Sequence, residues 1–474
     1  MKINKFQQIT SLSMLCSLVS LAQQKQPNVV FILADDLGYG DLSCYGQTKF
    51  STPNIDKLAA NGIKFTQHYS GCTVSAPSRS VLLTGLHTGH TPIRGNKNDS
   101  IYGQLPISDK TFTMAELFKK AGYATGCFGK WGLGATHNEG DPQKQGFDEF
   151  YGYYCQSDAH RYYPNSIWQN GKEISLNNNE KLNDYAPDFI QNQAIKFIEN
   201  HSEKPFFLFL PYILPHAEFI SPSDSILQKF QGKFLPEKSF QGNDYFNEKF
   251  TKNGYTSQDE IYATYASMIY RLDVYVGQII AKLKQLGLDK NTLVVFTSDN
   301  GPCIEGGADP DFFNSNGSFS GYKRDLTDGG IRVPMIISWS KMQHKSLETN
   351  HLSYFADFFS TFAELTNQMT TTKTDGVSLL PTIIGKGVQN VNPYLYWEFQ
   401  EQGGKQAIRM ENWKAIRLNM SNNKDAEILL YDLNTDIEEK KNVAANYPEI
   451  VKTMKKIFAE SHTKSENFKF EYEK

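Results

Sequence analysis

Carboxylate and amide side chains follow two apolar segments that have the character of buried strands. Asp35 and Asp36 come directly after the run from Asn28 to Ala34, and Asp299 and Asn300 follow a second such run. In open α/β sheets, ligands bind beyond the carboxyl ends of the strands. Oxygen ligands suit a hard cation such as Ca2+ or Mg2+, and the lack of His or Cys among them disfavours zinc. Asp35 and Asp36 alone could equally form a turn or a helix cap, but the second pair favours a metal site.

The segment from Ser75 to Arg79 has the residue types of an anion site at the start of a helix. Pro77 suits the first helical turn, so Ser75 would lie just before the helix, near the positive end of its dipole. Free N–H groups at that end favour an anion, and Arg79, one turn along, can point back to the same place. From this short motif alone, an ordinary helix capped by a serine is the better interpretation, and Arg79 alone could pair with a structural carboxylate.

Two basic side chains also follow strand-like runs. Lys130 follows the run from Tyr123 to Phe128, and His216 follows the run from Phe206 to Leu210. Imidazole titrates near neutral pH and suits proton transfer, and a fixed cation stabilises negative charge in a transition state. Taken alone, Lys130 or Lys323 would more often be a solvated surface residue.

Apolar runs that alternate with amphipathic stretches predict an α/β fold with a large, mixed, mostly parallel sheet flanked by helices. Start and stop signals predict helices over residues 53–60, 113–120 and about 260–286. After about Gly387 the strand-like segments become short, and a helix over 447–461 follows them. We therefore expect a catalytic domain at 23–387 and, at 388–474, a C-terminal α+β subdomain with a small antiparallel sheet.

Residues 1–22 have the features of a signal peptide. Lys2 and Lys5 precede a mostly apolar or small stretch, Ile9 to Leu21, and a small-x-small cleavage site ends at Ala22. The stretch is too short and too rich in serine for a membrane span, so we expect a periplasmic or secreted protein. The net charge of -3 over 474 residues offers no basic face for nucleic acid.

Together the motifs resemble the formylglycine-dependent (type I) sulfatase family, in its serine-type form and in its arylsulfatase and N-acetylgalactosamine-sulfatase-like branch. This family belongs to the alkaline phosphatase superfamily, which implies an alkaline-phosphatase-like fold. A bacterial carbohydrate scavenger is the implied setting. The matching segments occur in the expected order over nearly all of the mature chain: 28–40, 75–85, 129–134, 205–216, 297–301, Lys323 with 328–334, and 430–433.

The resemblance implies that a separate maturation enzyme oxidises Ser75 to formylglycine (3-oxoalanine). One hydroxyl of the hydrated aldehyde, bound to Ca2+, would attack sulfur, and the second would then expel sulfate. His216 would be the general acid, and Arg79, Lys130 and Lys323 would stabilise the transition state. The implied Ca2+ ligands are Asp35, Asp36, the residue at position 75, Asp299 and Asn300.

The chain departs from the family pattern at two positions. Gly132 stands where many relatives have a histidine that contacts the hydrated aldehyde, so we consider His137 and His160 as replacements. Asp328 stands where glutamate is usual, which is a milder change. A polar residue that helps to hold sulfate in relatives falls near Gln156, whose amide could donate a hydrogen bond.

Residues 151–163 are candidates for substrate recognition. Five tyrosines surround Asp158, His160 and Arg161 there; they could stack on sugar rings or equally pack the loop onto the core. We expect the three polar residues to recognise the sugar, and the stretch Glu398 to Gly404, with Lys405, to close the outer wall of the pocket. The implied substrate is a sulfated glycan from glycosaminoglycans or algae, with a galactose-type sugar as a weaker expectation.

Two alternatives stay open. A metal-dependent phosphoesterase could use unmodified Ser75, but such relatives usually bind two transition metals and often have histidine where this chain has Asn300. An inactive, glycan-binding pseudosulfatase is the other alternative. The presence of Ser75, Arg79, Lys130, His216 and Lys323 argues against it.

Overall fold

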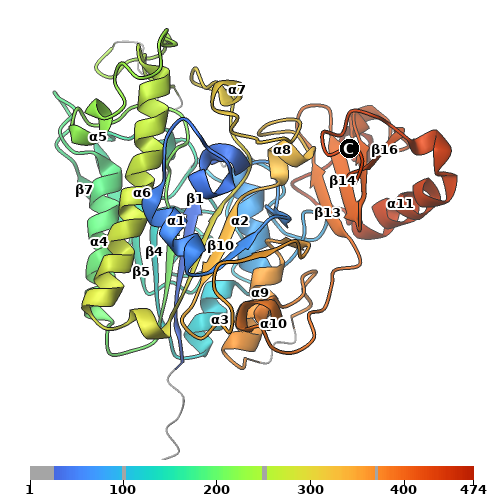
Figure 1. Cartoon of the computed structure of the whole chain (residues 1–474), viewed down its shortest axis with the longest axis horizontal. Helices are drawn as coiled ribbons and strands as arrows, with labels where there is room; N and C mark the ends of the chain where they lie inside the picture. The colour runs from blue at the N-terminus through green and yellow to red at the C-terminus, as the bar shows by residue number, and fades with distance from the viewer. Residues whose placement is uncertain (1–25, 99–102, 248–253, 369–371) are drawn as a thin grey trace, which may run out of the picture.

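The structure, a computed structural model, describes residues 26–98, 103–247, 254–368 and 372–474. The predicted signal peptide lies outside these residues. One mixed ten-stranded sheet dominates the fold (Figure 1). Its strands, from edge to edge, are β11 (Leu347–Thr349), β2 (Ile63–Phe65), β10 (Met335–Ser338), β9 (Thr292–Ser298), β1 (Asn28–Ala34), β8 (Phe206–Pro211), β4 (Ala124–Lys130), β5 (Glu149–Tyr153), β6 (Ser166–Gln169) and β7 (Lys172–Ser175).

The five adjacent strands from β9 to β5 run parallel, and antiparallel pairs begin at β10 on one side and at β6 on the other. The predicted mixed, mostly parallel sheet is therefore confirmed. A two-stranded sheet joins β3 (His68–Tyr69) to β12 (Ser353–Tyr354). The α-helices are α1 (Pro53–Ala60), α2 (Ser75–Thr84), α3 (Met114–Lys120), α4 (Ala186–Asn200), α5 (Ser225–Gln228), α6 (Ile261–Gln285), α7 (Pro310–Phe313), α8 (Asp328–Ile331), α9 (Asp357–Leu365), α10 (Leu380–Ile384) and α11 (Pro448–Ser461).

Strand β1 is buried on both faces, as its continuous apolar sequence predicts. Phe31 and Leu33 belong to the hydrophobic layer that contains α2, α3 and α9. Val30 and Ile32 belong to the opposite layer, which contains α1, α4 and α6. Because every second side chain of a strand points to the same face, one strand ties the two layers together.

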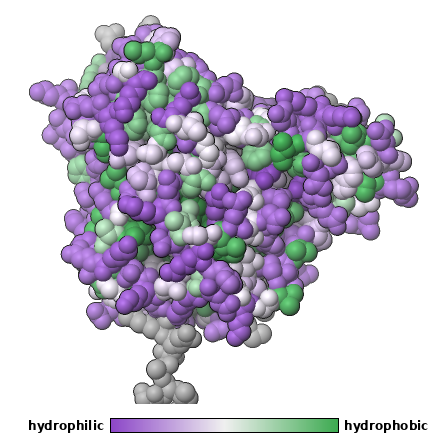
Figure 2. Space-filling model, in the orientation of Figure 1, coloured by the Kyte–Doolittle hydropathy of each residue, from purple (hydrophilic) through white to green (hydrophobic). Residues whose placement is uncertain are grey.

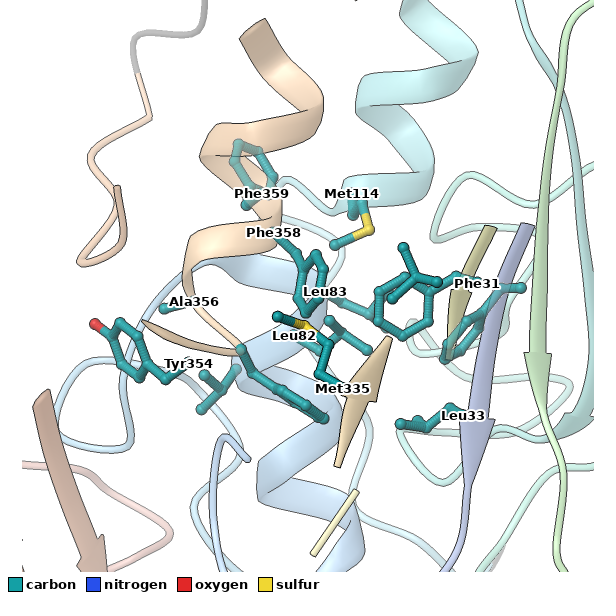
Figure 3. Close-up of a cluster of buried hydrophobic side chains, with 14 of the residues drawn as sticks. Phe31, Leu33, Leu82, Leu83, Met114, Met335, Tyr354, Ala356, Phe358 and Phe359 are labelled. Carbon is teal, nitrogen blue, oxygen red and sulfur yellow. The ribbon is translucent and has the colours of Figure 1, made fainter. Parts of the chain in front are cut away.

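Helix α2 is anchored by apolar side chains. Figure 3 shows Leu82 and Leu83 in the cluster between Phe31 of β1 and Phe358 of α9. All ten residues of α2 are buried. A close-packed interior resists displacement, so the first turn of α2, which begins at Ser75, is held firmly relative to β1.

The predicted helices agree with the structure within one residue at each end. Residues 53–60 form α1, and the stretches expected over 113–120, 260–286 and 447–461 form α3, α6 and α11. Thr113 caps α3 by accepting a hydrogen bond from the backbone N–H of Glu116.

The predicted C-terminal sheet is also present. It is antiparallel and contains β13 (Leu395–Phe399), β14 (Lys405–Met410), β15 (Trp413–Arg417) and β16 (Ile428–Asp432). One face packs with Met454 and Phe458 of α11. Trp397 and Phe399 of the other face join the main hydrophobic core, so the C-terminal sheet is built onto the larger one. The boundary at 387 stays a prediction.

The surface gives little sign of a large apolar interface on the face that Figure 2 shows, where hydrophobic residues lie scattered among hydrophilic ones. Among the described residues, no helix is both long enough and apolar enough to span a membrane. Their five cysteines are free thiols, and four of them are buried.

Candidate active site

The acidic pairs predicted at two strand ends lie side by side. Strands β1 and β9 are adjacent and parallel, with Ala34 opposite Ser298, so Asp35 and Asp36 meet Asp299 and Asn300. The backbone N–H of Asp36 donates to Asp299 at 3.2 Å, and the side-chain amide of Asn300 donates to Asp36 at 2.8 Å. All four residues are buried.

Ser75 faces this acidic group from the start of α2. It is the first residue of the helix, whereas the sequence predicted it just before the helix. Val74 is the N-cap residue instead. The Ser75 hydroxyl donates to Asp35 at 3.1 Å. Ser78, one turn further, donates to the backbone carbonyl of Asp299 at 2.6 Å. The helix is therefore bonded directly to the acidic strand ends.

Arg79 and Lys130 supply positive charge to the same carboxylates. The guanidinium of Arg79 donates to Asp35 at 3.1 Å and to Asp299 at 2.8 Å. The ammonium of Lys130 lies 2.6 Å from Asp35 and 3.5 Å from the Ser75 hydroxyl. Both side chains are buried. Arg79 is thus committed to two carboxylates, whereas Lys130 also reaches Ser75.

Lys323 and His216 form the other side of the cluster. The Lys323 ammonium lies 2.9 Å from Asp36 and 3.2 Å from Nε2 of His216. Nδ1 of His216 bonds to the backbone carbonyl of Ala217, which places the ring proton on Nδ1 and leaves Nε2 as an acceptor. Burial, together with Lys323 and Lys130, lowers the pKa of His216 to about 3. The ring is therefore neutral at pH 7 in the protein alone.

The three aspartates titrate differently because their neighbours differ. Burial raises the pKa of each, but Lys130, His216 and Arg79 hold the pKa of Asp35 below its usual range. The pKa of Asp36 stays raised, since burial outweighs the ammonium of Lys323. Burial and the charge of Asp35 raise the pKa of Asp299 to about 6, against the guanidinium of Arg79.

The oxygen-rich side of the cluster fits a hard cation. Oδ1 of Asn300 is buried and has no hydrogen-bond partner within the described part of the chain. Asp36 has a φ of 61°, and such strained backbone is typical of functional sites. Asp35, Asp36 and His216 each offer a ligand atom within 4.8 Å of the others. Carboxylate oxygens and an amide oxygen together match the preference of Ca2+.

Comparison with known proteins identifies the architecture. A family model described as Sulfatase matches residues 27–368, and a model described as N-sulphoglucosamine sulphohydrolase, C-terminal, matches residues 317–464. The chain belongs to the sulfatase family. Sulfatases are sulfuric ester hydrolases, and this activity together with the alkaline-phosphatase-like fold applies to this sulfatase.

Two curated relatives and one solved structure show how far the similarity extends. An N-acetylgalactosamine-6-O-sulfatase of Bacteroides thetaiotaomicron is 30% identical, over 93% of this chain and 94% of the relative. An N-acetylgalactosamine-6-sulfatase of Mus musculus is 29% identical, over 80% of this chain and 70% of the relative. The crystal structure of Ps i-CgsB in complex with k-i-k-neocarrahexaose has a TM-score of 0.77 and 27% identity, over 94% of each chain.

The space beside Gly132 of this sulfatase is filled by a side chain from the loop after β5. A Cβ atom at position 132 would lie 2.3 Å from Nε2 of Gln156 and 3.8 Å from Cδ of Arg79, and Gly132 has a φ of +77°. The amide of Gln156 therefore occupies the space that a histidine at 132 would need. Its Nε2 is buried without a hydrogen-bond partner among the described residues. His137, in contrast, is exposed.

Of the remaining candidates for substrate recognition, only His160 is seen in contact with the general-acid candidate. The ring of His160 stacks on that of His216, with centroids 5.0 Å apart. Arg161 is buried and bonds to Glu218 at 2.5 Å and to Asn243 at 3.0 Å. Asp158 lines a cavity of about 160 Å³ with Arg161 and several aromatic side chains. Of the three residues, His160 is the one in contact with His216. We call the group around His216 the catalytic cluster, for the role proposed below; it contains Asp35, Asp36, Ser75, Arg79, Lys130, His216, Asp299, Asn300 and Lys323.

Two residues at the site carried no signal in the sequence. Asn96 accepts a hydrogen bond from the backbone N–H of Ala76 at 3.1 Å, and its own N–H donates to Glu401 at 3.1 Å. Glu305 lies 3.5 Å from the Lys323 ammonium; burial opposes its ionisation, but Lys323 and Arg324 lower its pKa to about 2. Neither residue follows an apolar run or belongs to a spaced motif, so only the fold brings them here.

Proposed function

We propose that this sulfatase hydrolyses sulfate esters of carbohydrates with a formylglycine made from Ser75 and a bound Ca2+. The observation that carries the proposal is the position of the Ser75 hydroxyl, 3.1 Å from Asp35 and 3.5 Å from Lys130 within one buried cluster. Oxidation and hydration at position 75 would supply one hydroxyl to attack sulfur and a second to expel sulfate. Ca2+ would favour deprotonation of the attacking hydroxyl, and Asp35, Asp36, Asp299, Asn300 and residue 75 would hold it.

The cations of the cluster divide the work. Lys130 and Lys323 stabilise the sulfuryl oxygens as negative charge develops, because fixed charges in a buried site need no reorganisation. Arg79 is already bonded to Asp35 and Asp299, so its main contribution is to hold two metal ligands in place. Gln156 donates its free amide hydrogen to sulfate or to the hydrated residue at 75, the contact for which relatives use histidine.

Protonation of the leaving group involves two residues. In the protein alone, Nε2 of His216 accepts a hydrogen bond from the ammonium of Lys323 at 3.2 Å. A proton held between these two nitrogens is available to a departing sugar alkoxide on the same side of the cluster. We therefore assign general acid catalysis to His216 with Lys323 as its proton-sharing partner.

The substrate class follows from the relatives and from the outer residues. The similarity to an N-acetylgalactosamine-6-O-sulfatase and the k-i-k-neocarrahexaose in the Ps i-CgsB complex both support a sulfated glycan. In this proposal His160 and Asp158 recognise its hydroxyl groups. Export by the signal peptide at 1–22, to the periplasm or outside a bacterial cell, and oxidation of Ser75 by a separate maturation enzyme complete the proposal.

Lys323 disfavours the phosphoesterase alternative. Asp36, Cys303 and Glu305 form a second group that could hold an ion, which a two-metal mechanism would need. The Lys323 ammonium lies 2.9 Å from Asp36 and 3.5 Å from Glu305. A fixed organic cation therefore takes the place of a second metal ion.

Mass spectrometry of the peptide that contains position 75 tests the proposal. Protein from a host with a maturation enzyme should show a loss of about 2 Da at Ser75, because the oxidation removes two hydrogens. The same protein should hydrolyse an aryl sulfate, and a Ser75→Ala variant should not. Ester hydrolysis by protein with an intact Ser75 would instead support the phosphoesterase, and modified but inactive protein would support the pseudosulfatase.

A further inference from the structure

A second group of buried charges lies where the C-terminal sheet meets the catalytic part of the chain. We call it the Asp328 cluster; it contains Asp328, Arg332, Lys414 and Glu439. The Lys414 ammonium, from β15, donates to Asp328 of α8 at 2.7 Å and lies 3.4 Å from Glu439. Arg332 lies 3.2 Å from Asp328. In Figure 1, α8 lies between the main sheet and β13 and β14.

The segment that carries Asp328 also carries Lys323 and contacts the metal-ligand turn. The backbone N–H of Gly301, directly after Asn300, donates to the carbonyl of Gly330 at 3.0 Å. A Cβ atom on Gly301 would lie 2.0 Å from the carbonyl oxygen of Gly329. The N–H of Lys323 donates to Pro302 at 2.9 Å. Any displacement of α8 is therefore transmitted to Asn300 and Lys323.

The C-terminal sheet and the loop that follows β16 hold this segment at several points. Besides Lys414, Glu439 accepts a hydrogen bond from the backbone N–H of Asp328 at 2.6 Å. The Lys405 ammonium donates to the backbone carbonyl of Arg324 at 2.7 Å. Arg324 follows Lys323 directly and has a φ of 77°, a conformation that the surrounding contacts must maintain.

We propose that Lys414 is a positioning residue for sulfate ester hydrolysis, acting through Asp328 on Lys323 and Asn300. The inference rests on the roles proposed above for those two residues. Lys414 itself is fully buried and bonded within the Asp328 cluster, and its ammonium also lies near the rings of Tyr69 and Trp397. Its bond to α8 is the connection through which it acts on the site. Removing its charge leaves Asp328 and Glu439 next to each other without the ammonium that separates them, and α8 moves.

The test compares Lys414→Met with Met454→Ala in full-length protein that carries formylglycine. Met454 belongs to α11 and is buried against the outer face of the C-terminal sheet, in a hydrophobic cluster that does not include α8, so its variant controls for loss of stability. Both are assayed on an aryl sulfate at a temperature where circular dichroism shows them folded. We expect kcat of Lys414→Met to fall about 10- to 100-fold, since small displacements of catalytic groups have effects of that size. Met454→Ala should stay within about twofold of the wild-type kcat, and Lys414→Arg should recover part of the loss.

Calcium titration by calorimetry gives a readout that does not depend on turnover. Lys414→Met should bind Ca2+ more weakly than Met454→Ala, because Asn300 is displaced only in the former. Equal kcat values for wild type and Lys414→Met, or an equal fall in Met454→Ala, would overturn the inference. Wild-type and Ser75→Ala proteins in the same assay show separately whether the proposed function holds.

If Lys414→Met does not fold, Lys405→Met replaces it. Its ammonium is partly exposed and holds Arg324 from the side of the surface, so the variant keeps the buried cluster. A fall in kcat of about 3- to 10-fold at an unchanged unfolding temperature supports positioning by the C-terminal sheet. A wild-type kcat in Lys405→Met would then count against it.

Discussion

The catalytic cluster and the Asp328 cluster both bury carboxylates beside ammonium and guanidinium groups, but their carboxylates are balanced differently. Burial raises the pKa of Asp328, yet Lys414, Arg332 and Arg409 outweigh it and hold that pKa below its usual range. Asp299 faces another carboxylate and shares one guanidinium, so burial and Asp35 raise its pKa to about 6. Each cluster also holds a carboxylate of the other kind, since burial raises the pKa of Glu439 to about 7 and the neighbouring cations lower the pKa of Asp35. The difference is one of degree: two of the three aspartates of the catalytic cluster, Asp36 and Asp299, keep raised pKa values, and carboxylates whose charge is not fully offset favour a further cation.

The largest expected effect comes from opening the closed cluster. Asp328→Asn should lower the free energy of unfolding by about 3–5 kcal/mol, because the buried Lys414 loses its principal partner. Urea denaturation monitored by fluorescence measures the change. Asp299→Asn is the matched control and should have a smaller effect, since the charged form of Asp299 is already disfavoured. Equal losses in the two variants would remove the distinction between the clusters.

In the catalytic cluster, a substitution should reduce activity strongly and stability only slightly. Lys130→Met should lower kcat/KM about 100- to 1,000-fold, the size found when one preorganised charge-stabilising group is removed. Its stability should change little, because Asp35 keeps the guanidinium of Arg79. Aryl sulfate kinetics and thermal unfolding of the same preparation give both numbers. A large loss of stability with modest loss of activity would reverse the assignment of this cluster.

Calcium should stabilise the protein by binding at the catalytic cluster. At a Ca2+ concentration of about 100 times Kd, binding to the native state alone adds about 2.7 kcal/mol to the free energy of unfolding. Thermal unfolding with and without a chelator detects this shift. Asn300→Leu should reduce it because one oxygen ligand is lost, and an undiminished shift in that variant would place the ion elsewhere.

The smallest expected effect lies outside both clusters, at His462 in the C-terminal part. Its ring bonds to Glu398 at 2.8 Å and to Glu473 at 2.9 Å. Burial opposes protonation, but the two carboxylates raise the pKa of His462 to about 8, above its value of about 6.5 in an unfolded chain. The protonated ring therefore stabilises the fold fully below about pH 6.5, and this contribution is lost as the pH rises through 8.

A His462→Gln variant isolates that contribution. The unfolding temperature of the wild type should fall between about pH 6.5 and 8.5, and the variant should show a flatter profile over the same range. Activity at pH 7 should not change, because His462 lies away from Ser75 in the C-terminal part. Identical pH profiles for the two proteins would show that protonation of His462 does not stabilise the fold.

Much of the catalytic cluster could be predicted because its residues follow strands with distinctive sequences. β1 and β9 are continuous apolar runs, and their ends carry Asp35, Asp36, Asp299 and Asn300. The hairpin of β6 and β7 was not predicted, since its strands are short and largely polar. The space filled by Gln156 at Gly132 depends on how a loop folds back, which no local pattern records.

The Asp328 cluster could not be predicted for a different reason. Lys414 lies 86 residues from Asp328 along the chain. The alternation of apolar and polar residues in its strand predicts which side chains face the core, but it does not predict an acidic partner. A lysine in such a strand is usually a surface residue. Its burial depends on an acidic partner from another element, so only the assembled fold shows that this lysine is internal.

The backbone contact between Gly301 and Gly329 has a consequence for the modular engineering of sulfatases. Because no side chain fits between the two turns, their relative position tolerates almost no adjustment. A chimera that takes its C-terminal sheet from a relative would replace Lys414, the partner of Asp328. The turn at Gly301, against which α8 packs, would stay the same. Such an exchange should succeed only when residues 320–332 are transplanted together with the sheet, so the natural unit of recombination crosses the apparent domain boundary.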